Sequence, residues 1–211
     1  MTAHTEDQVT GPADSSQPID HDVSPRPWYV LVLVAALGGL VSAGWQIVER
    51  IATAENADAG SVCDFSAVVS CSSVFTQWQS SALGVPNTLV SLPVFAAFAA
   101  TAAAGLLASR FARPYLAGLL GLSVFMAGFA TWYSFQTAFV MGAMCLFCTI
   151  GSFAVLTVGI GITRVAAARR ALGHGRAGRA LELLVNSTSD VIAWVGLILV
   201  NAGMLYFGLP F

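Results

Sequence analysis

Residues 115–163 read YLAGLLGLSVFMAGFATWYSFQTAFVMGAMCLFCTIGSFAVLTVGIGIT, and no charged side chain interrupts them. A transmembrane helix needs about 20 apolar residues, because an α-helix rises about 1.5 Å per residue through a hydrocarbon core of about 30 Å. The stretch is too long for one crossing. We therefore predict two spans, near residues 115–141 and 145–163, that reverse at Gly142.

Three more uncharged stretches have the length of a span: residues 28–48, 85–109 and 191–211. Across all 211 residues, 56% are hydrophobic and 9% are charged, whereas a soluble domain carries about 25% charge. The sequence therefore predicts an all-α integral membrane protein. Residues 28–163 would form a four-helix transmembrane bundle, and residues 191–211 would add a fifth transmembrane helix.

The arginines predict how the chain is oriented. Eight of them fall on one side of the predicted spans, and Arg50 falls on the other; the eight are Arg26, Arg110, Arg113, Arg164, Arg169, Arg170, Arg176 and Arg179. The positive-inside rule then makes residues 1–27 a cytoplasmic tail, which we expect to be disordered, and 164–190 a basic cytoplasmic connector. All nine basic residues are arginine, and this absence of lysine, together with abundant alanine, suggests a bacterial source. We therefore expect a multi-pass protein of the bacterial cytoplasmic (inner) membrane.

Within the connector, residues 164–172 have two interpretations. They form a short basic helix along the lipid headgroups, or they only anchor the orientation. The opposite face of the membrane would carry the loop 52–84 and the start of the fourth span.

The four cysteines form two pairs at that outer face. Cys63 and Cys71 lie in the loop 52–84, and Cys145 and Cys148 form a Cys-Leu-Phe-Cys motif where the fourth span begins. Two intervening residues let both sulfurs meet one bond or one metal ion. Three interpretations follow: a zinc or iron–sulfur site, structural disulfides in a non-catalytic docking platform, or a redox relay.

The relay explains the pattern best. No histidine lies near the cysteines in the sequence to complete a metal site, and a Cys145–Cys148 bond closes too small a loop to be a useful staple. A helix N-terminus stabilises a thiolate, which is the attacking species in disulfide exchange. With no flavin or haem motif, we expect electrons to leave to a membrane quinone, without a metal. A net charge of −2 and no basic stripe give no sign of nucleic-acid binding.

One family resembles this arrangement. The segment CDFSAVVSCSSVF at residues 63–75, followed downstream by Cys145-x-x-Cys148, closely resembles the vitamin K epoxide reductase family. The resemblance covers residues 28–163. It implies a quinone-dependent membrane thiol oxidoreductase that generates disulfides by oxidising an extracytoplasmic thioredoxin-fold partner. Some bacterial members carry a thioredoxin-like domain after the fifth span. None follows here, so we expect a separate partner protein, and menaquinone or ubiquinone as acceptor.

The resemblance also implies roles for individual residues. Cys148 would lie next to the quinone, Cys145 would alternate between bonds to Cys148 and Cys71, and Cys63 would form the mixed disulfide with the partner. Asn87 resembles the asparagine that hydrogen-bonds a quinone carbonyl. Its alternative role is to cap the second span, which asparagine does well.

Further positions near the quinone are less uniform. Phe75 and Trp78 would cover the quinone ring, or they are ordinary interfacial aromatic residues. Gln77 stands where family members often have a serine, and Ser152 stands where vertebrate members have a tyrosine. These two departures favour disulfide formation over the alternative activity, reduction of vitamin K epoxide. Asp64 should disfavour a thiolate on Cys63 by like-charge repulsion.

Overall fold

Five long apolar helices make up most of the chain in the computed structural model, which describes residues 25–56 and 60–209. They are α1 (Arg26–Glu55), α3 (Asn87–Leu106), α4 (Arg113–Gln136), α5 (Leu146–Ala168) and α7 (Ser189–Gly208). Shorter elements are α2 (Cys71–Phe75), η2 (Trp78–Ser81), the π-helical turn η3 (Thr137–Met141) that continues α4, and α6 (Arg176–Asn186). The five long helices are long and apolar enough to cross a membrane, which confirms the predicted all-α, multi-pass membrane protein.

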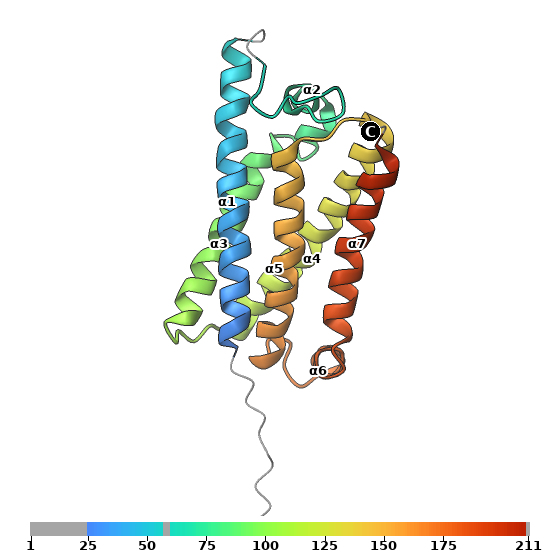
Figure 1. Ribbon diagram of the computed structural model, residues 1–211. Coiled ribbons are helices and arrows are strands. Elements are labelled where there is room, and N and C mark those ends of the chain that lie inside the picture. The colour runs from blue at the N-terminus through green and yellow to red at the C-terminus, as the bar shows by residue number, and fades with distance from the viewer. Residues whose placement is uncertain (1–24, 57–59, 210–211) are drawn as a thin grey trace, which may run out of the picture.

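Four of the helices share one core. Helix α1 packs between α3 and α5, α4 packs against α5, and α7 lies outside this bundle against α4 and α5 (Figure 1). The core is filled by large buried side chains such as Tyr29, Phe98 and Leu116. At Gly161 of α5, a side chain would collide with Val32 of α1, so glycine lets these two helices approach closely. The packing is a four-helix bundle with a fifth helix added to its side.

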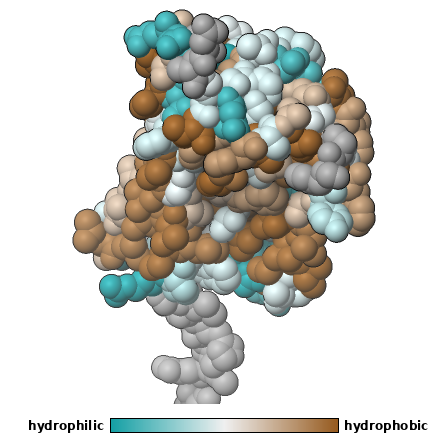
Figure 2. Space-filling model, turned by 45° about the horizontal axis from the view of Figure 1, so that its top comes forward, coloured by the Kyte–Doolittle hydropathy of each residue, from teal (hydrophilic) through white to brown (hydrophobic). Residues whose placement is uncertain are grey.

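The outer surface of the bundle is apolar. Large hydrophobic side chains point outward along α1 and α7, among them Val34, Val41, Ile192 and Leu199. Figure 2 shows hydrophobic residues around the middle of one face and hydrophilic residues gathered toward its ends. Such a surface is stable in lipid, where apolar side chains need no shielding from water.

The reversal between the third and fourth long helices, α4 and α5, lies where the sequence predicts it. Gly142 has φ 65°, in the left-handed region that glycine adopts without strain, and its N–H bonds to Thr137 O. Several helix ends differ from the prediction. Helix α1 continues past residue 48 to Glu55, because Glu49 and Arg50 find hydrogen-bond partners and need not leave the helix for water.

The connector differs more. A helix confined to residues 164–172 is wrong: α5 continues to Ala168, and turns separate it from α6, which lies across the ends of α5 and α7 (Figure 1). Arg164 belongs to α5, where it donates to both carboxylate oxygens of Asp190 at 2.7 and 2.8 Å, and its guanidinium lies 4.9 Å from the Trp28 ring centroid. This partly buried pairing accommodates the charge of Arg164 within α5. Most of the predicted disordered tail, residues 1–24, lies outside the described residues, and α1 already begins at Arg26.

Candidate active site

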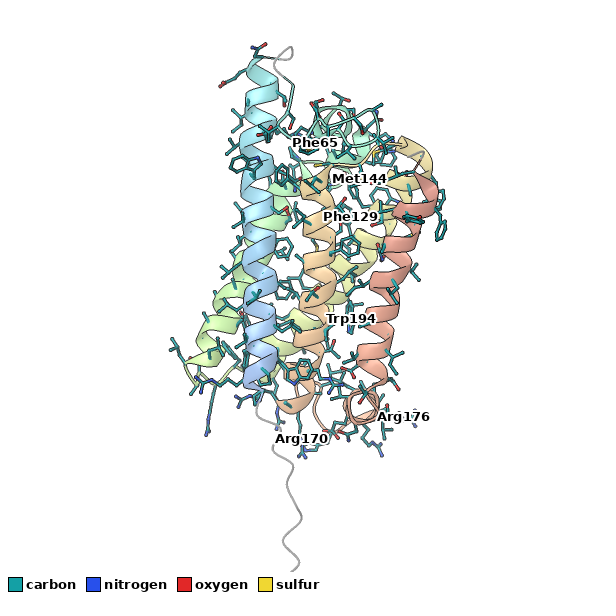
Figure 3. The ribbon with its side chains drawn as sticks, in the orientation of Figure 1. Phe65, Phe129, Met144, Arg170, Arg176 and Trp194 are labelled. Carbon is teal, nitrogen blue, oxygen red and sulfur yellow. A yellow bond between two sulfur atoms is a disulfide. The ribbon has the colours of Figure 1, made fainter. Side chains whose placement is uncertain are left out.

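All four cysteines lie at one end of the bundle, which we term the cysteine end. Cys63 and Cys71 form a disulfide with their Cα atoms 5.6 Å apart. Cys71 is the first residue of α2, Cys145 is the N-cap of α5, and Cys148 lies in the first turn of α5. Figure 1 shows α2 above the start of α5, and Figure 3 places the labelled Phe65 and Met144 at this same end.

A short backbone pairing joins the two cysteine segments. Val69 and Met144 form an isolated parallel bridge, in which Ser70 N–H donates to Met144 O at 3.0 Å and Met144 N–H donates to Val68 O at 2.7 Å. The pairing fixes the positions of the two segments relative to each other, just before Cys71 in one and Cys145 in the other. The pairing accounts for contact between residues that are far apart in the sequence.

The sulfur of Cys145 lies next to the disulfide. Its distance to Cys71 Sγ is 2.9 Å, and the sulfurs of Cys63, Cys71 and Cys145 all lie within 4.8 Å of one another. Three clustered sulfurs are one possible metal-binding pattern, but two of them are bonded to each other here and offer no thiolate. The geometry suits disulfide exchange between Cys145 and the Cys63–Cys71 bond.

A buried carboxylate of α1 holds the beginning of the cysteine loop. Glu49 Oε2 accepts hydrogen bonds from Ser61 Oγ at 2.6 Å and from Val62 N at 3.1 Å. One helical position later, Arg50 Nη2 donates to Phe75 O at 3.0 Å, to Ser80 Oγ at 3.1 Å and to Ser81 Oγ at 3.3 Å. The end of α1 thus fixes the loop on both sides of the disulfide.

Asp64 closes the loop from within. Its carboxylate accepts from Ser61 N at 2.7 Å, Ser70 Oγ at 2.9 Å and Ser72 N at 3.1 Å. Partial burial raises the pKa of Asp64, but these hydrogen bonds from Ser61, Ser72 and Ser70 outweigh it and leave the pKa below its usual value. Asp64 therefore organises the loop backbone around the disulfide. The expected repulsion between Asp64 and a Cys63 thiolate stays a prediction, since Cys63 is oxidised here.

The inner pair sits at a helix start. Cys148 N–H donates to Cys145 Sγ at 3.4 Å, so a backbone N–H of the first turn of α5 faces the Cys145 sulfur. Cys148 Sγ donates to Gln46 Oε1 of α1 at 3.1 Å.

A cavity opens beside Cys148. Its empty volume is about 710 Å³, counting the open mouth, and its walls come from α1, α3, α4 and α5 together with the segment around α2 and η2. Its apolar lining includes Phe75, Phe95, Met126 and Phe129, the last labelled on α4 in Figure 3. Cys148 is thus at the wall of an apolar chamber inside the bundle.

Within the described part of the chain, three buried polar atoms of residues that line this cavity make no hydrogen bond: Asn87 Oδ1, Thr88 Oγ1 and the Tyr133 hydroxyl. Unsatisfied buried polar groups are costly and need an explanation such as a bound ligand. A quinone presents a flat apolar ring with two carbonyl acceptors, and the Thr88 and Tyr133 hydroxyls can donate to such acceptors. The cavity lining therefore fits a quinone ring.

The residues expected near a quinone are not all in the lining. Phe75, Asn87 and Ser152 line the cavity, whereas Trp78 is 65% exposed and lies 6.0 Å from Trp132, centroid to centroid. The alternative role of Asn87 as a helix cap is wrong, because Pro86 is the N-cap and Asn87 Nδ2 donates to Gln79 O at 2.7 Å.

Two of these positions bear on the departures from the family pattern. Ser152 Oγ donates to Cys148 O at 3.0 Å within α5. Gln77 is exposed, whereas the nearby Ser80 lines the cavity.

Sequence reasoning missed five residues of the site: Gln46, Glu49, Arg50, Thr88 and Tyr133. A signal for the first three was present. They are spaced i, i+3 and i+4, so they share one helix face at the end of an apolar span, where polar residues are costly and tend to be functional. Thr88 and Tyr133 carry no such signal, because lone hydroxyls are common in transmembrane helices.

One comparison with known proteins succeeds. The model of the Vitamin K epoxide reductase family matches residues 30–163, which covers α1 to most of α5. No curated protein matches the chain.

Proposed function

Because the chain belongs to the vitamin K epoxide reductase family, and is therefore a membrane oxidoreductase, we propose that it generates disulfides by passing electrons from a thiol partner to a membrane quinone. The partner would be a separate, extracytoplasmic thioredoxin-fold protein. The observation that carries the proposal is the 2.9 Å distance between Cys71 Sγ and Cys145 Sγ, which links the loop disulfide to the cysteine pair beside the cavity.

The first half of the reaction takes place at the loop. A partner thiolate attacks Cys63 Sγ, the Cys63–Cys71 bond breaks, and Cys71 leaves as a thiolate. The second partner thiolate then attacks its own mixed-disulfide sulfur and releases Cys63. The partner gains one disulfide, and the outer pair holds the two electrons.

The second half moves these electrons inward. The Cys71 thiolate attacks Cys145 in a Cys145–Cys148 disulfide, and Cys148 leaves as a thiolate. Cys63 then attacks Cys71, which restores the outer disulfide and frees Cys145. The described structure, with Cys63 bonded to Cys71 and with Cys145 and Cys148 free, matches the state after these exchange steps.

Cys148 completes the reaction at the cavity wall. A quinone, when bound, supplies the oxidising power by accepting two electrons and two protons. Thr88 and Tyr133 offer hydroxyl donors, Asn87 adds an amide, and the aromatic lining excludes water. Cys145 lies one helical turn from Cys148, so it can close the inner disulfide as Cys148 is oxidised.

We place the cysteine end at the extracytoplasmic face of the bacterial inner membrane. The support is the distribution of arginine: Figure 3 shows the labelled Arg170 and Arg176 at the end opposite Phe65 and Met144. Reporter fusions within residues 169–175 test this, because a reporter active only outside the cytoplasm should stay inactive there.

Quinone reduction by purified protein in detergent tests the function. With reduced thioredoxin-fold protein as donor and short-chain menaquinone or ubiquinone as acceptor, Cys148→Ala should abolish the absorbance change of the quinone. Thr157→Ala, farther along α5, should not. Normal reduction by Cys148→Ala would exclude the relay. No reduction by folded wild type with any quinone would favour the non-catalytic platform.

A further inference from the structure

We infer that the Gln46 carboxamide stabilises the reactive sulfur of Cys148 in both of its protonation states. The inference rests on the proposed function only for the importance of Cys148. The contact itself is a hydrogen bond of 3.1 Å from Cys148 Sγ to Gln46 Oε1.

Gln46 occupies a costly position. Its side chain is 5% exposed, within the membrane-spanning helix α1, and it lines the cavity on the side that faces Cys148. An amide without a hydrogen-bond partner is destabilising in such apolar surroundings. The hydrogen bond to Cys148 is therefore a reason for glutamine to be tolerated at this position.

An amide suits a sulfur that changes its protonation state. A thiol is a donor and needs an acceptor, which Oε1 provides. A thiolate is an acceptor and needs a donor, which Nε2 provides after rotation about the broad terminal torsion of glutamine. Leucine or methionine at this position would offer no N–H to the thiolate.

A second contact keeps Gln46 and Cys148 aligned. One helical turn before Gln46, Ser42 Oγ donates to Phe147 O at 2.5 Å and ties the Cys-Leu-Phe-Cys segment to α1. The start of α5 therefore cannot slide along α1 without breaking this bond.

Other groups around Cys148 also act on its charge. Arg50 comes from α1, Tyr133 from α4 and Cys145 from the start of α5, while α3 contributes the uncharged Asn87 and Thr88. Arg50 keeps its positive charge near Cys148 while its guanidinium donates to Phe75, Ser80 and Ser81. Because this charge remains, loss of Gln46 should reduce the population of the Cys148 thiolate without removing it.

The test measures the Cys148 thiolate directly, with no quinone present. In full-length Cys145→Ala protein with the outer disulfide intact, Cys148 is the single free thiol, and a small methanethiosulfonate reports its thiolate fraction through the reaction rate at each pH. Gln46→Leu should move the pH profile upward and lower the rate at neutral pH roughly tenfold, because the hydrogen bond lost to the thiolate is stronger than the one lost to the thiol.

Two further variants keep the test decisive. Gln46→Met, closer in shape, should show the same shift if Gln46→Leu does not fold. Asn201→Leu removes another buried amide, in α7 and away from the cavity, and should leave the profile unchanged. An unchanged profile in both Gln46 variants, or an equal shift in Asn201→Leu, would overturn the inference. Neither result would affect the requirement for Cys148 in quinone reduction, which tests the proposed function separately.

Discussion

The two ends of the bundle use buried charge differently. At the cysteine end, Glu49 and Arg50 bind mainly backbone and hydroxyl groups of an irregular loop. At the opposite end, Arg164 and Asp190 bind each other across two helices, with Trp28 beneath the guanidinium.

The difference separates a part that must move from a part that must stay. The hydrogen bonds that Glu49 and Arg50 make to the loop can be broken one at a time. The loop can therefore open and expose the Cys63–Cys71 disulfide without unfolding of the bundle. A bidentate ion pair between helices has one geometry and fixes α7 to α5. We expect substitutions at the two ends to affect different measurements.

Cys63→Ala should have the largest effect on turnover. The remaining Cys71 thiol lies 2.9 Å from Cys145, so a Cys71–Cys145 disulfide should accumulate, and partner oxidation should fall to the uncatalysed rate. Non-reducing peptide mapping by mass spectrometry checks the bond, with Ser66→Ala in the same loop as control. Partner oxidation at the normal rate would show that Cys63 is not the entrance.

Arg164→Leu should affect stability more than chemistry. The substitution leaves the Asp190 carboxylate buried without its partner. We expect the free energy of unfolding to fall by about 3 kcal/mol, the lower bound for breaking a buried ion pair. Thermal unfolding in detergent should show the loss, and the double variant Arg164→Leu/Asp190→Leu should recover part of it. A loss of quinone reduction greater than the loss of folded protein would mean that the two ends are coupled.

Glu49→Gln should loosen the loop without unfolding the bundle. The amide keeps one acceptor oxygen but loses the charge that strengthens the hydrogen bonds to Ser61 and Val62. We expect a phosphine to reduce the Cys63–Cys71 bond about tenfold faster, since hydrogen bonds to charged groups contribute about 1.5–3 kcal/mol. Glu55→Gln, at the exposed end of α1, is the matched control. Equal rates in both variants would remove Glu49 from the account of the loop.

Asp64 should add a smaller, pH-dependent effect. The pKa of Asp64 in the folded protein is below the ordinary value of 3.8. Its contribution to the stability of the loop is therefore complete above pH 3.8, and it is lost as the pH falls through the pKa of the folded protein. Phosphine reduction of the loop disulfide should therefore accelerate only in acid. Asp64→Asn should begin about threefold faster and lack most of this acid rise, because hydrogen bonds of an exposed carboxylate contribute little. Identical pH profiles for both proteins would contradict this.

The sequence predicted the parts of the fold that depend on local composition. Uncharged length gives the five spans, and the reversal at Gly142 follows from a stretch too long for one helix. The helix ends were less predictable, because Glu49 remains in α1 only through partners in the loop. The position of α6 likewise depends on the ion pair between Arg164 and Asp190. No local sequence pattern predicts that these two residues pair.

The cysteines of the candidate site were predictable from the sequence, but the residues around them were predictable only in part. Two paired-cysteine motifs indicate exchange chemistry, and the family resemblance ordered the cysteines. The register that brings Cys71 to Cys145 depends on the pairing of Val69 with Met144, a long-range contact. Trp78 does not match the expected quinone contact: it lies close to the loop cysteines in the sequence, but its side chain is exposed and is not part of the cavity lining.

Burial of the sulfurs has a consequence for leakage of reducing equivalents. Cys63, Cys71 and Cys145 are 1%, 0% and 1% exposed, so dissolved small thiols find no sulfur to attack while the loop is closed. A protein that binds the exposed Val62 and Phe65 brings contact energy that can open the loop, whereas a small thiol does not. We therefore expect the loop to insulate the relay kinetically, so that selectivity among donors is set by loop opening and not by reduction potential.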